Sequence, residues 1–180
     1  MVKRGFLMLV LAIAAAACDK DSPTAPADPN LVVFTAQLSS QNEIPPITGT
    51  EAGARGDVRI TVNLIRDTAN NITGATYNFV VNLNSFPASG SSWTLAHIHE
   101  GASTVAGPVR VNTGLTPATA IAVNGSVSNQ TFSNIPFNTT VNTDAVRIIN
   151  DMITNPAGWY FNAHTALNGG GVVRGQLVKQ

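Results

Sequence analysis

The chain has a single cysteine among its 180 residues. One thiol cannot form an intramolecular disulfide, so no disulfide framework stabilises the fold. Asp, Glu, Lys and Arg make up only 11% of the residues, against roughly 25% in ordinary soluble domains. The ten basic and ten acidic residues cancel, so no net field attracts nucleic acid or an anionic lipid surface. Nucleic acid is therefore excluded as an expected partner.

Familiar catalytic motifs are also missing. The chain has no Gly-x-Ser-x-Gly nucleophile elbow, no phosphate-binding loop and no His-Glu-x-x-His motif. The acids that a carboxylate-pair hydrolase would need are scattered, which is typical of solvated positions: Glu43, Glu51, Asp57 and Glu100. These absences favour a protein that is not an enzyme and leave such a hydrolase as the alternative.

The N-terminus has the features of an export signal. Two basic residues precede an apolar run over residues 6–17, which is too short to span a bilayer as a stable helix. We expect residues 1–17 to be a signal peptide of the lipoprotein type, because small residues lead to Cys18 in a pattern that resembles the bacterial lipobox. Lipidated Cys18 would anchor an exported protein to a membrane of the bacterial cell envelope. Ordinary cleavage near Ala17 is the alternative.

Residues 18–30 predict a flexible tether. After the cysteine, the segment DKDSPTAPADPN has three prolines, four charges and no bulky apolar side chain. Such a segment buries too little apolar surface to offset the entropy lost on ordering. The folded domain is therefore expected over residues 31–180.

Two segments alternate between apolar and polar residues, the pattern of half-buried strands. Residues 57–65 and 75–83 flank a turn-rich stretch, so they predict an antiparallel hairpin. Further short strands are expected at residues 31–38, 93–100, 109–111, 118–123, 127–132, 158–165 and 171–178. This pattern predicts an all-β fold, an antiparallel Greek-key-like sandwich or barrel.

One segment has helical periodicity instead. Apolar side chains over residues 144–153 recur at the spacing of one helix face. Thr143 is the expected N-cap, and Asn155-Pro156 is the expected stop. We expect one short helix of about three turns that closes one end of the sheet.

All three histidines lie in two apolar segments that predict strands. Side chains alternate along a strand, so His97 and His99 are expected on one face together with Trp93 and Leu95. Imidazoles at this spacing are common metal ligands, and His164 would complete a set of three if its strand pairs nearby. Zn²⁺ or Cu²⁺ is the expected cofactor of such a site.

With the metal site as the alternative, the sequence favours a structural role in which no cofactor is bound. The rings then hydrogen-bond the backbone and join an internal polar network with Glu43, Asn162, Thr165 and Arg174. Glu43 is the carboxylate expected beside the histidines, since Glu100 points to the other face of its strand. Arg174 is expected to pair with a buried carboxylate such as Glu43. Both interpretations stay open at this point.

The order of the motifs resembles the CHRD domain, a module repeated in chordin and found singly in many bacterial secreted proteins. The resemblance covers residues 32–179 and rests on separated blocks: residues 34–38 (FTAQL), 42–46 (NEIPP), 96–101 (AHIHEG), 160–165 (YFNAHT) and 171–177 (GVVRGQL). The family's usual closing motif is Gly-Glu-Ile-Arg-Gly-Gln, whereas this chain has Val172 and Val173 before Arg174. The resemblance implies a non-enzymatic extracellular module that binds a protein or a carbohydrate or has a structural role.

A weaker similarity concerns the copper/zinc superoxide dismutases. Their copper site begins with His-x-His on a strand of a Greek-key sandwich, as His97 and His99 would here. The similarity implies a superoxide-dismutase-like version of the metal hypothesis. Three histidines are too few for the complete two-metal site of those enzymes.

Overall fold

The structure, a computed structural model, describes residues 28–180. The predicted signal peptide over residues 1–17, the predicted lipidation site Cys18 and most of the predicted tether lie outside the described residues. Within the described part of the chain, no helix has the length and apolar character needed to cross a bilayer.

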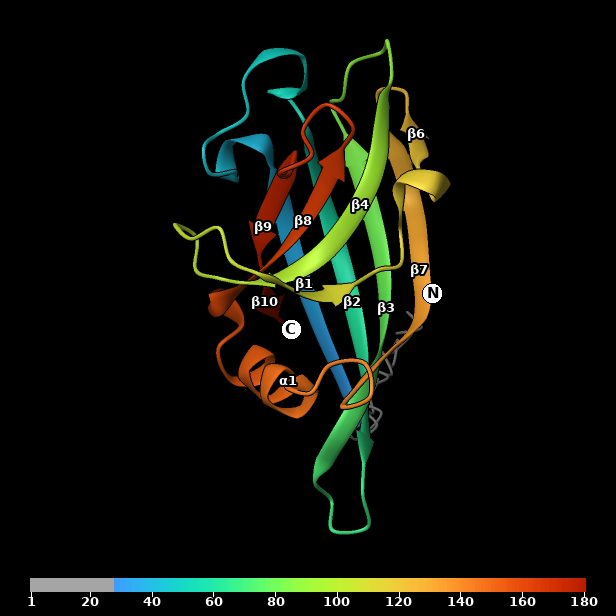
Figure 1. Ribbon diagram of the computed structural model, residues 1–180, viewed down its shortest axis with the longest axis vertical. Helices are drawn as coiled ribbons and strands as arrows, with labels where there is room; N and C mark the ends of the chain where they lie inside the picture. The colour runs from blue at the N-terminus through green and yellow to red at the C-terminus, as the bar shows by residue number, and fades with distance from the viewer. Residues whose placement is uncertain (1–27) are drawn as a thin grey trace, which may run out of the picture.

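Ten strands and one α-helix make up the regular structure of residues 28–180. They are β1 Leu31–Ser39, β2 Arg55–Arg66, β3 Ile72–Asn84, β4 Ser91–Glu100, β5 Val109–Asn112, β6 Ile121–Val123, β7 Val127–Asn138, α1 Ala145–Thr154, β8 Trp159–Thr165, β9 Val173–Gln176 and β10 Val178–Lys179. The strands form one antiparallel sheet in the order β5-β4-β8-β9-β1-β2-β3-β7, with β10 beside β1 and β6 beside β4 (Figure 1). The sheet curves into a nearly closed barrel, so the predicted all-β class with one short helix is confirmed.

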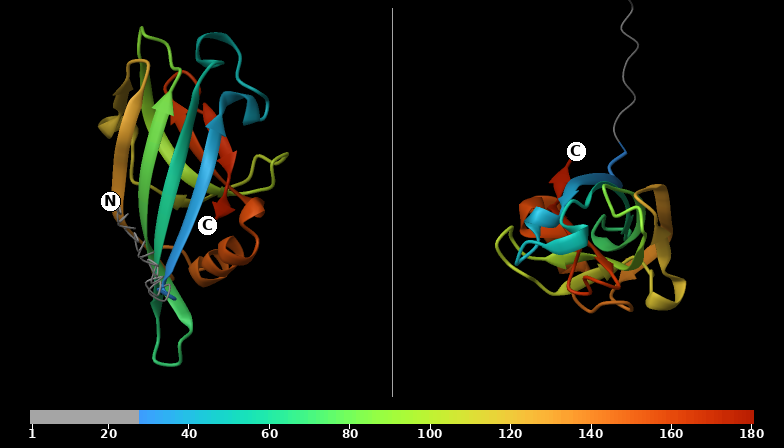
Figure 2. Two further views of the ribbon diagram at one scale, coloured as in Figure 1. Left: turned by 180° about the vertical axis from the view of Figure 1, so that it is seen from behind. Right: turned by 90° about the horizontal axis from the view of Figure 1, so that it is seen from above.

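The barrel has two walls around one core. The long strands β1, β2, β3 and β7 form one wall, and β4, β8 and β9 form the opposite one (Figure 2). Phe34, Ile60 and Phe79 point inward from the first wall, and Ile98 and Phe161 point inward from the second. The rings of Phe79 and Phe161 meet with their centroids 6.0 Å apart. Each such side chain contributes about 1.5–3 kcal/mol through burial, so this contact fixes the wall that carries the histidines.

The predicted β2–β3 hairpin is confirmed. Ile60 lies opposite Phe79 in the register, and the apolar side chains of both strands are buried while the alternate ones are more exposed. Strict alternation therefore fixed the register, because a slip by one residue would expose every core side chain.

Helix α1 closes one end of the barrel (Figure 1). Its buried face includes Ile148, Ile149 and Met152, at the predicted helical spacing. The hydroxyl of Tyr77 on β3 donates to the sulfur of Met152 over 3.6 Å. The helix thus continues the core beyond the sheet.

The predicted N-cap of this helix is wrong. Asp144 and not Thr143 precedes the first helical residue, and the Asp144 side chain makes no capping hydrogen bond. The side chain of Asn142 accepts the backbone N–H of Asp144 over 2.9 Å, so a turn occupies the position where a capping threonine was expected. The predicted stop is confirmed, since Asn155 is the C-cap and Pro156 follows it.

Strand β7 is longer than predicted because it continues to Asn138. Asn129 and Asn134 interrupt its alternation at φ values of 53° and 57°. The side chains of Asn82 and Asn78 on β3 accept the backbone N–H groups at these two positions, over 2.8 and 2.9 Å. These irregularities break the period of two on which the prediction depended.

Strand β6 is shorter than predicted, since it begins only at Ile121. Residues Pro117–Thr119 form a turn of 3₁₀-helix at the place where its start was expected.

Candidate metal centre

A bulge in β4 decides which face the histidines occupy. The register between β4 and β8 shifts between Trp93 and Leu95, so β4 carries one extra residue there. Trp93 and Ile98 are fully buried in the core, whereas His97 and His99 point to the opposite, outer face of the wall. The prediction that Trp93 shares a face with the two histidines is therefore wrong, because the extra residue reverses the alternation.

Strand β8 brings the third histidine to the same face. Leu95 lies opposite His164 and His97 lies opposite Asn162, so His97 and His164 are diagonal neighbours on paired strands. His97 Nδ1 and His164 Nε2 are 3.2 Å apart. One ring nitrogen from each of His97, His99 and His164 lies within 4.8 Å of the other two. Three imidazoles from two strands thus meet in one cluster.

Backbone carbonyls fix the orientation of two of these rings. His99 Nδ1 lies 2.9 Å from the oxygen of Gly107, and His164 Nδ1 lies 3.1 Å from the oxygen of Gly169. A carbonyl only accepts, so both Nδ1 atoms carry the proton and donate it. In a neutral ring this leaves the lone pair on Nε2. Metal-binding histidines have this arrangement, in which the second ring nitrogen donates to a carbonyl or carboxylate.

The same loops shield the cluster from water. Gly107 belongs to the loop of residues 101–108 after β4, and Gly169 belongs to the loop of residues 166–172 after β8. His97, His99 and His164 are only 7%, 7% and 5% exposed. The cluster is therefore nearly buried although it lies on the outer face of the wall.

Burial keeps the three rings uncharged. It lowers the pKa of His97 to about 4, with the charges of His164 and His99 adding to the effect. It also lowers the pKa of His99 to about 4, against the hydrogen bond to Gly107 that raises it. The pKa of His164 is lowered by burial as well. At neutral pH all three imidazoles are neutral, which is the state that metal coordination requires.

Three buried polar side-chain atoms have no hydrogen-bond partner within residues 28–180. They are His99 Nε2, Glu43 Oε1 and Asn162 Oδ1. All three are acceptors, given the tautomer of His99. A buried polar atom without a partner costs about 1–3 kcal/mol, so a cation or a hydrogen-bond donor that paired with these atoms would stabilise the fold.

Tyr160 also belongs to this face, although no sequence motif predicted it there. Its ring stacks on His99 with centroids 4.8 Å apart and an interplanar angle of 12°. The backbone N–H of Gly107 donates to its hydroxyl over 3.0 Å, and the guanidinium of Arg174 lies 3.6 Å from its ring centroid. The available signal was the even spacing of Tyr160 from His164 along one strand, which places both on one face.

Glu43 and Asn162 lie side by side at the edge of the cluster. A Cβ atom on Gly171, where φ is 136°, would come within 2.8 Å of Glu43 Oε2 and 2.5 Å of Asn162 Nδ2, so only glycine fits there. Burial raises the pKa of Glu43 to about 7, although the charge of Arg174 and a hydrogen bond from Asn162 lower it. Glu43 is not among the groups within 4.8 Å of one another, so the structure places this carboxylate beside the three histidines and not between them.

Arg174 does not form the expected ion pair with Glu43. No nitrogen–oxygen contact within 4.0 Å joins the two side chains in the part of the chain that is described. The buried guanidinium instead donates to the carbonyl oxygens of Ala102 and Val105, over 3.1 to 3.2 Å, and to Gln176 Oε1 over 3.3 Å. Arg174 therefore holds the loop of residues 101–108 against the wall.

Thr165 belongs to a different polar network from the other predicted residues. Its hydroxyl donates to Glu51 Oε2 over 2.7 Å, and the side-chain amide of Asn168 donates to the same oxygen over 2.6 Å. Glu51 is only 1% exposed, and no sequence motif marked it for burial. This network ties the loop before β2 to the end of β8.

Comparisons with known proteins place these residues in a family. A family model described as the CHRD domain matches residues 34–177. The match includes all three histidines, Glu43, Asn162 and Arg174, and it confirms the resemblance derived from the sequence motifs. No curated protein and no solved structure matches the chain.

Proposed function

The chain belongs to the CHRD domain family, and we propose that it is a metal-binding domain in which His97, His99 and His164 hold one divalent transition-metal ion. The proposal depends on one observation: hydrogen bonds fix the tautomers of His99 and His164. His99 and His164 each donate Nδ1–H to a backbone carbonyl, which leaves their Nε2 lone pairs for a ligand.

The separations of the ring nitrogens support the proposal. An ion with metal–nitrogen bonds of about 2.0–2.1 Å in tetrahedral geometry needs ligand atoms about 3.3 Å apart. His97 Nδ1 and His164 Nε2 already lie 3.2 Å apart. One nitrogen from each of the three rings lies within 4.8 Å of the other two, so the rings have to approach one another by at most about 1.5 Å.

The ligand set selects the class of metal. Three neutral imidazoles without a thiolate suit Zn²⁺ and Cu²⁺, and Cu²⁺ binds more tightly at a given nitrogen site. Three protein ligands also leave one coordination position for water or a small ligand. We therefore propose Zn²⁺ or Cu²⁺ as the resident ion.

Metal analysis of the full chain, purified without a histidine tag, tests the proposal. After treatment with a chelator, one equivalent of Zn²⁺ or Cu²⁺ should bind per chain and raise the melting temperature, because an ion that binds only the folded state stabilises it. The matched control is His99→Phe, which keeps an aromatic ring stacked on Tyr160 and removes the lone pair. Absence of bound metal, with an unchanged melting temperature, would leave the histidines a purely structural role.

We also propose that the domain works outside the cytoplasm on a lipid anchor in the cell envelope. The support is the signal-like pattern of residues 1–17 and the position of Cys18. Labelled palmitate should be incorporated into the wild-type chain, and Cys18→Ser should abolish that incorporation. Equal labelling of both chains, or none of either, would contradict the anchor.

A further inference from the structure

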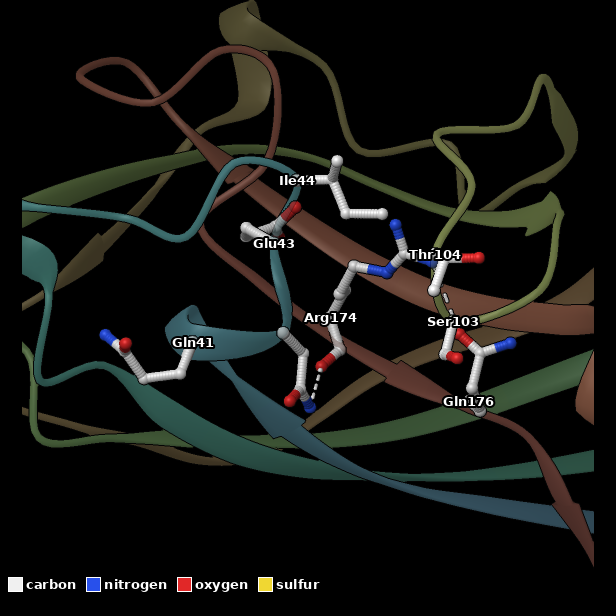
Figure 3. Close-up of a pocket in the computed structure, with 8 residues that line it drawn as sticks. Gln41, Glu43, Ile44, Ser103, Thr104, Arg174 and Gln176 are labelled. Carbon is white, nitrogen blue, oxygen red and sulfur yellow. Dashed lines mark hydrogen bonds between the residues drawn. The ribbon is translucent and has the colours of Figure 1, made fainter.

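A pocket of about 600 Å³ lies on the same side of the barrel as the histidine cluster. The turn after β1 provides Asn42, Glu43 and Ile44, and the loop of residues 101–108 provides Ser103 and Thr104 (Figure 3). The guanidinium of Arg174 forms its third side. Its volume is within the range of roughly 300–1,000 Å³ that small-molecule sites occupy.

Glu43 is the acidic group that lines this pocket. Its side chain is only 7% exposed, and Oε1, which is itself closed to solvent, accepts no hydrogen bond from any group in residues 28–180. Glu43 lies next to Ile44 in the lining of the pocket, and the guanidinium of Arg174 lies on the side of Thr104 (Figure 3). A carboxylate that lines a pocket favours a ligand with hydrogen-bond donors.

Arg174 does not need an anionic ligand to satisfy its guanidinium. Its guanidinium already donates to the carbonyls of Ala102 and Val105 and lies over the ring of Tyr160. Its positive charge also disfavours a cationic ligand at Glu43. Among residues 28–180, Glu43 and Arg174 are the only charged residues that line the pocket, and their charges cancel when Glu43 is ionised. The lining therefore suits a neutral ligand with several hydrogen-bond donors.

The loop of residues 101–108 adds two hydroxyl groups that can hydrogen-bond such a ligand. The hydroxyls of Ser103 and Thr104 are exposed, and neither makes a hydrogen bond within the described residues. A hydroxyl both donates and accepts, so it pairs well with the hydroxyls of a sugar. The exposed side chain of Ile44 offers the apolar surface against which a sugar ring can pack.

We propose that this pocket binds a neutral saccharide, with sugar hydroxyls donating to the carboxylate of Glu43 and hydrogen-bonding Ser103 and Thr104. None of His97, His99 and His164 lines this pocket. The inference therefore goes beyond the proposed metal binding and does not depend on it.

Saturation-transfer NMR on the full chain tests the proposal. The probes are glucose, N-acetylglucosamine, maltose and chitobiose as neutral sugars, with glycine as a zwitterion, acetate as an anion and putrescine as a cation. At least one neutral sugar should receive saturation at millimolar concentration. At pH 8, above the pKa of about 7 of Glu43, Glu43→Gln should weaken the binding of that sugar about tenfold, since a charged acceptor is lost.

Two exposed serines provide a matched pair of variants that keep the fold. Ser103→Tyr fills the pocket from an exposed loop and should abolish saturation of the sugar. Ser133→Tyr, on an exposed position of β7, should leave it unchanged. Saturation of glycine, acetate or putrescine but of no sugar would overturn the proposal, as would silence of all probes or full binding to Ser103→Tyr.

Discussion

His97 Nδ1 and His164 Nε2 lie 3.2 Å apart, although 67 positions separate these residues along the chain. Because His164 Nδ1–H donates a hydrogen bond to the carbonyl of Gly169, His164 Nε2 is the acceptor and His97 Nδ1 is the donor in the contact between the two rings. A metal ion would replace this hydrogen bond by two metal–nitrogen bonds and move the proton of His97 to its Nε2. The metal-free contact thus prepares the ligand geometry.

Removal of one imidazole should abolish tight metal binding. His164→Ala should lower the affinity for Zn²⁺ at least about 100-fold, because loss of a ligand exceeds the roughly 10–100-fold effect of changing an outer-shell group. Competition titration against a chelating dye measures the change. Asn112→Ala, on an exposed residue opposite His97 on β5, is the control and should bind as the wild type does. Equal affinity of His164→Ala and wild type would contradict the proposed ligand set.

The carbonyl of Gly107 should affect the metal affinity, although it is not one of the proposed ligands. A Cβ atom at this position would clash with the carbonyl oxygen of Glu100, so Gly107→Ala must displace the acceptor of His99 Nδ1. We expect the metal affinity to fall about 10–100-fold. Gly170→Ala is the control, since a Cβ there meets nothing within 4 Å. The same titration compares the two, and a matching loss in both variants would argue against this role of Gly107.

Glu43 should make the wild type less stable as the pH rises. Its pKa is about 7 in the folded state, against 4.5 as the ordinary value, so the unfolded chain releases this proton first. Stability from the neutral carboxyl group is therefore present below about pH 4.5 and is lost as the pH rises through about 7. Glu43→Gln cannot ionise, so its stability relative to wild type should increase by about 2 kcal/mol between about pH 5 and about pH 8. Urea unfolding at several pH values measures this, and a difference that does not change with pH would refute it.

Arg174 should stabilise the loop of residues 101–108. Arg174→Met removes the donors to the carbonyls of Ala102 and Val105 and the cation over Tyr160. We expect the free energy of unfolding to fall by on the order of 2–4 kcal/mol and hydrogen exchange in the loop to accelerate. Arg59→Met, on an exposed position of β2, should change the stability by less than about 0.5 kcal/mol. Unchanged exchange in the loop would show that other contacts hold it.

The sequence predicted those parts of the fold in which a regular period runs without interruption. Alternation located the β2–β3 hairpin, and the helical spacing located α1. The extra residue in β4 has no such signal, because neither glycine nor proline marks the bulge after Trp93. The full length of β7 was hidden because Asn129 and Asn134 break its alternation.

The candidate site could be predicted in part for the same reason. The spacing of His97 and His99 placed both on one face, and the family resemblance covered all three histidines. The hydrogen bonds from the histidine rings to the carbonyls of Gly107 and Gly169 could not be predicted, because the position of a loop's backbone carbonyl does not depend on a recognisable pattern of side chains. The role of Arg174 differed from expectation because its partners are such carbonyls as well.

Anomalous diffraction from crystals of the zinc-loaded, untagged protein shows directly whether the three histidines bind one ion. We expect one anomalous peak at about 2.0–2.1 Å from His97 Nδ1, His99 Nε2 and His164 Nε2. A peak bound elsewhere, or no peak while His97 and His164 keep their hydrogen bond, would contradict it.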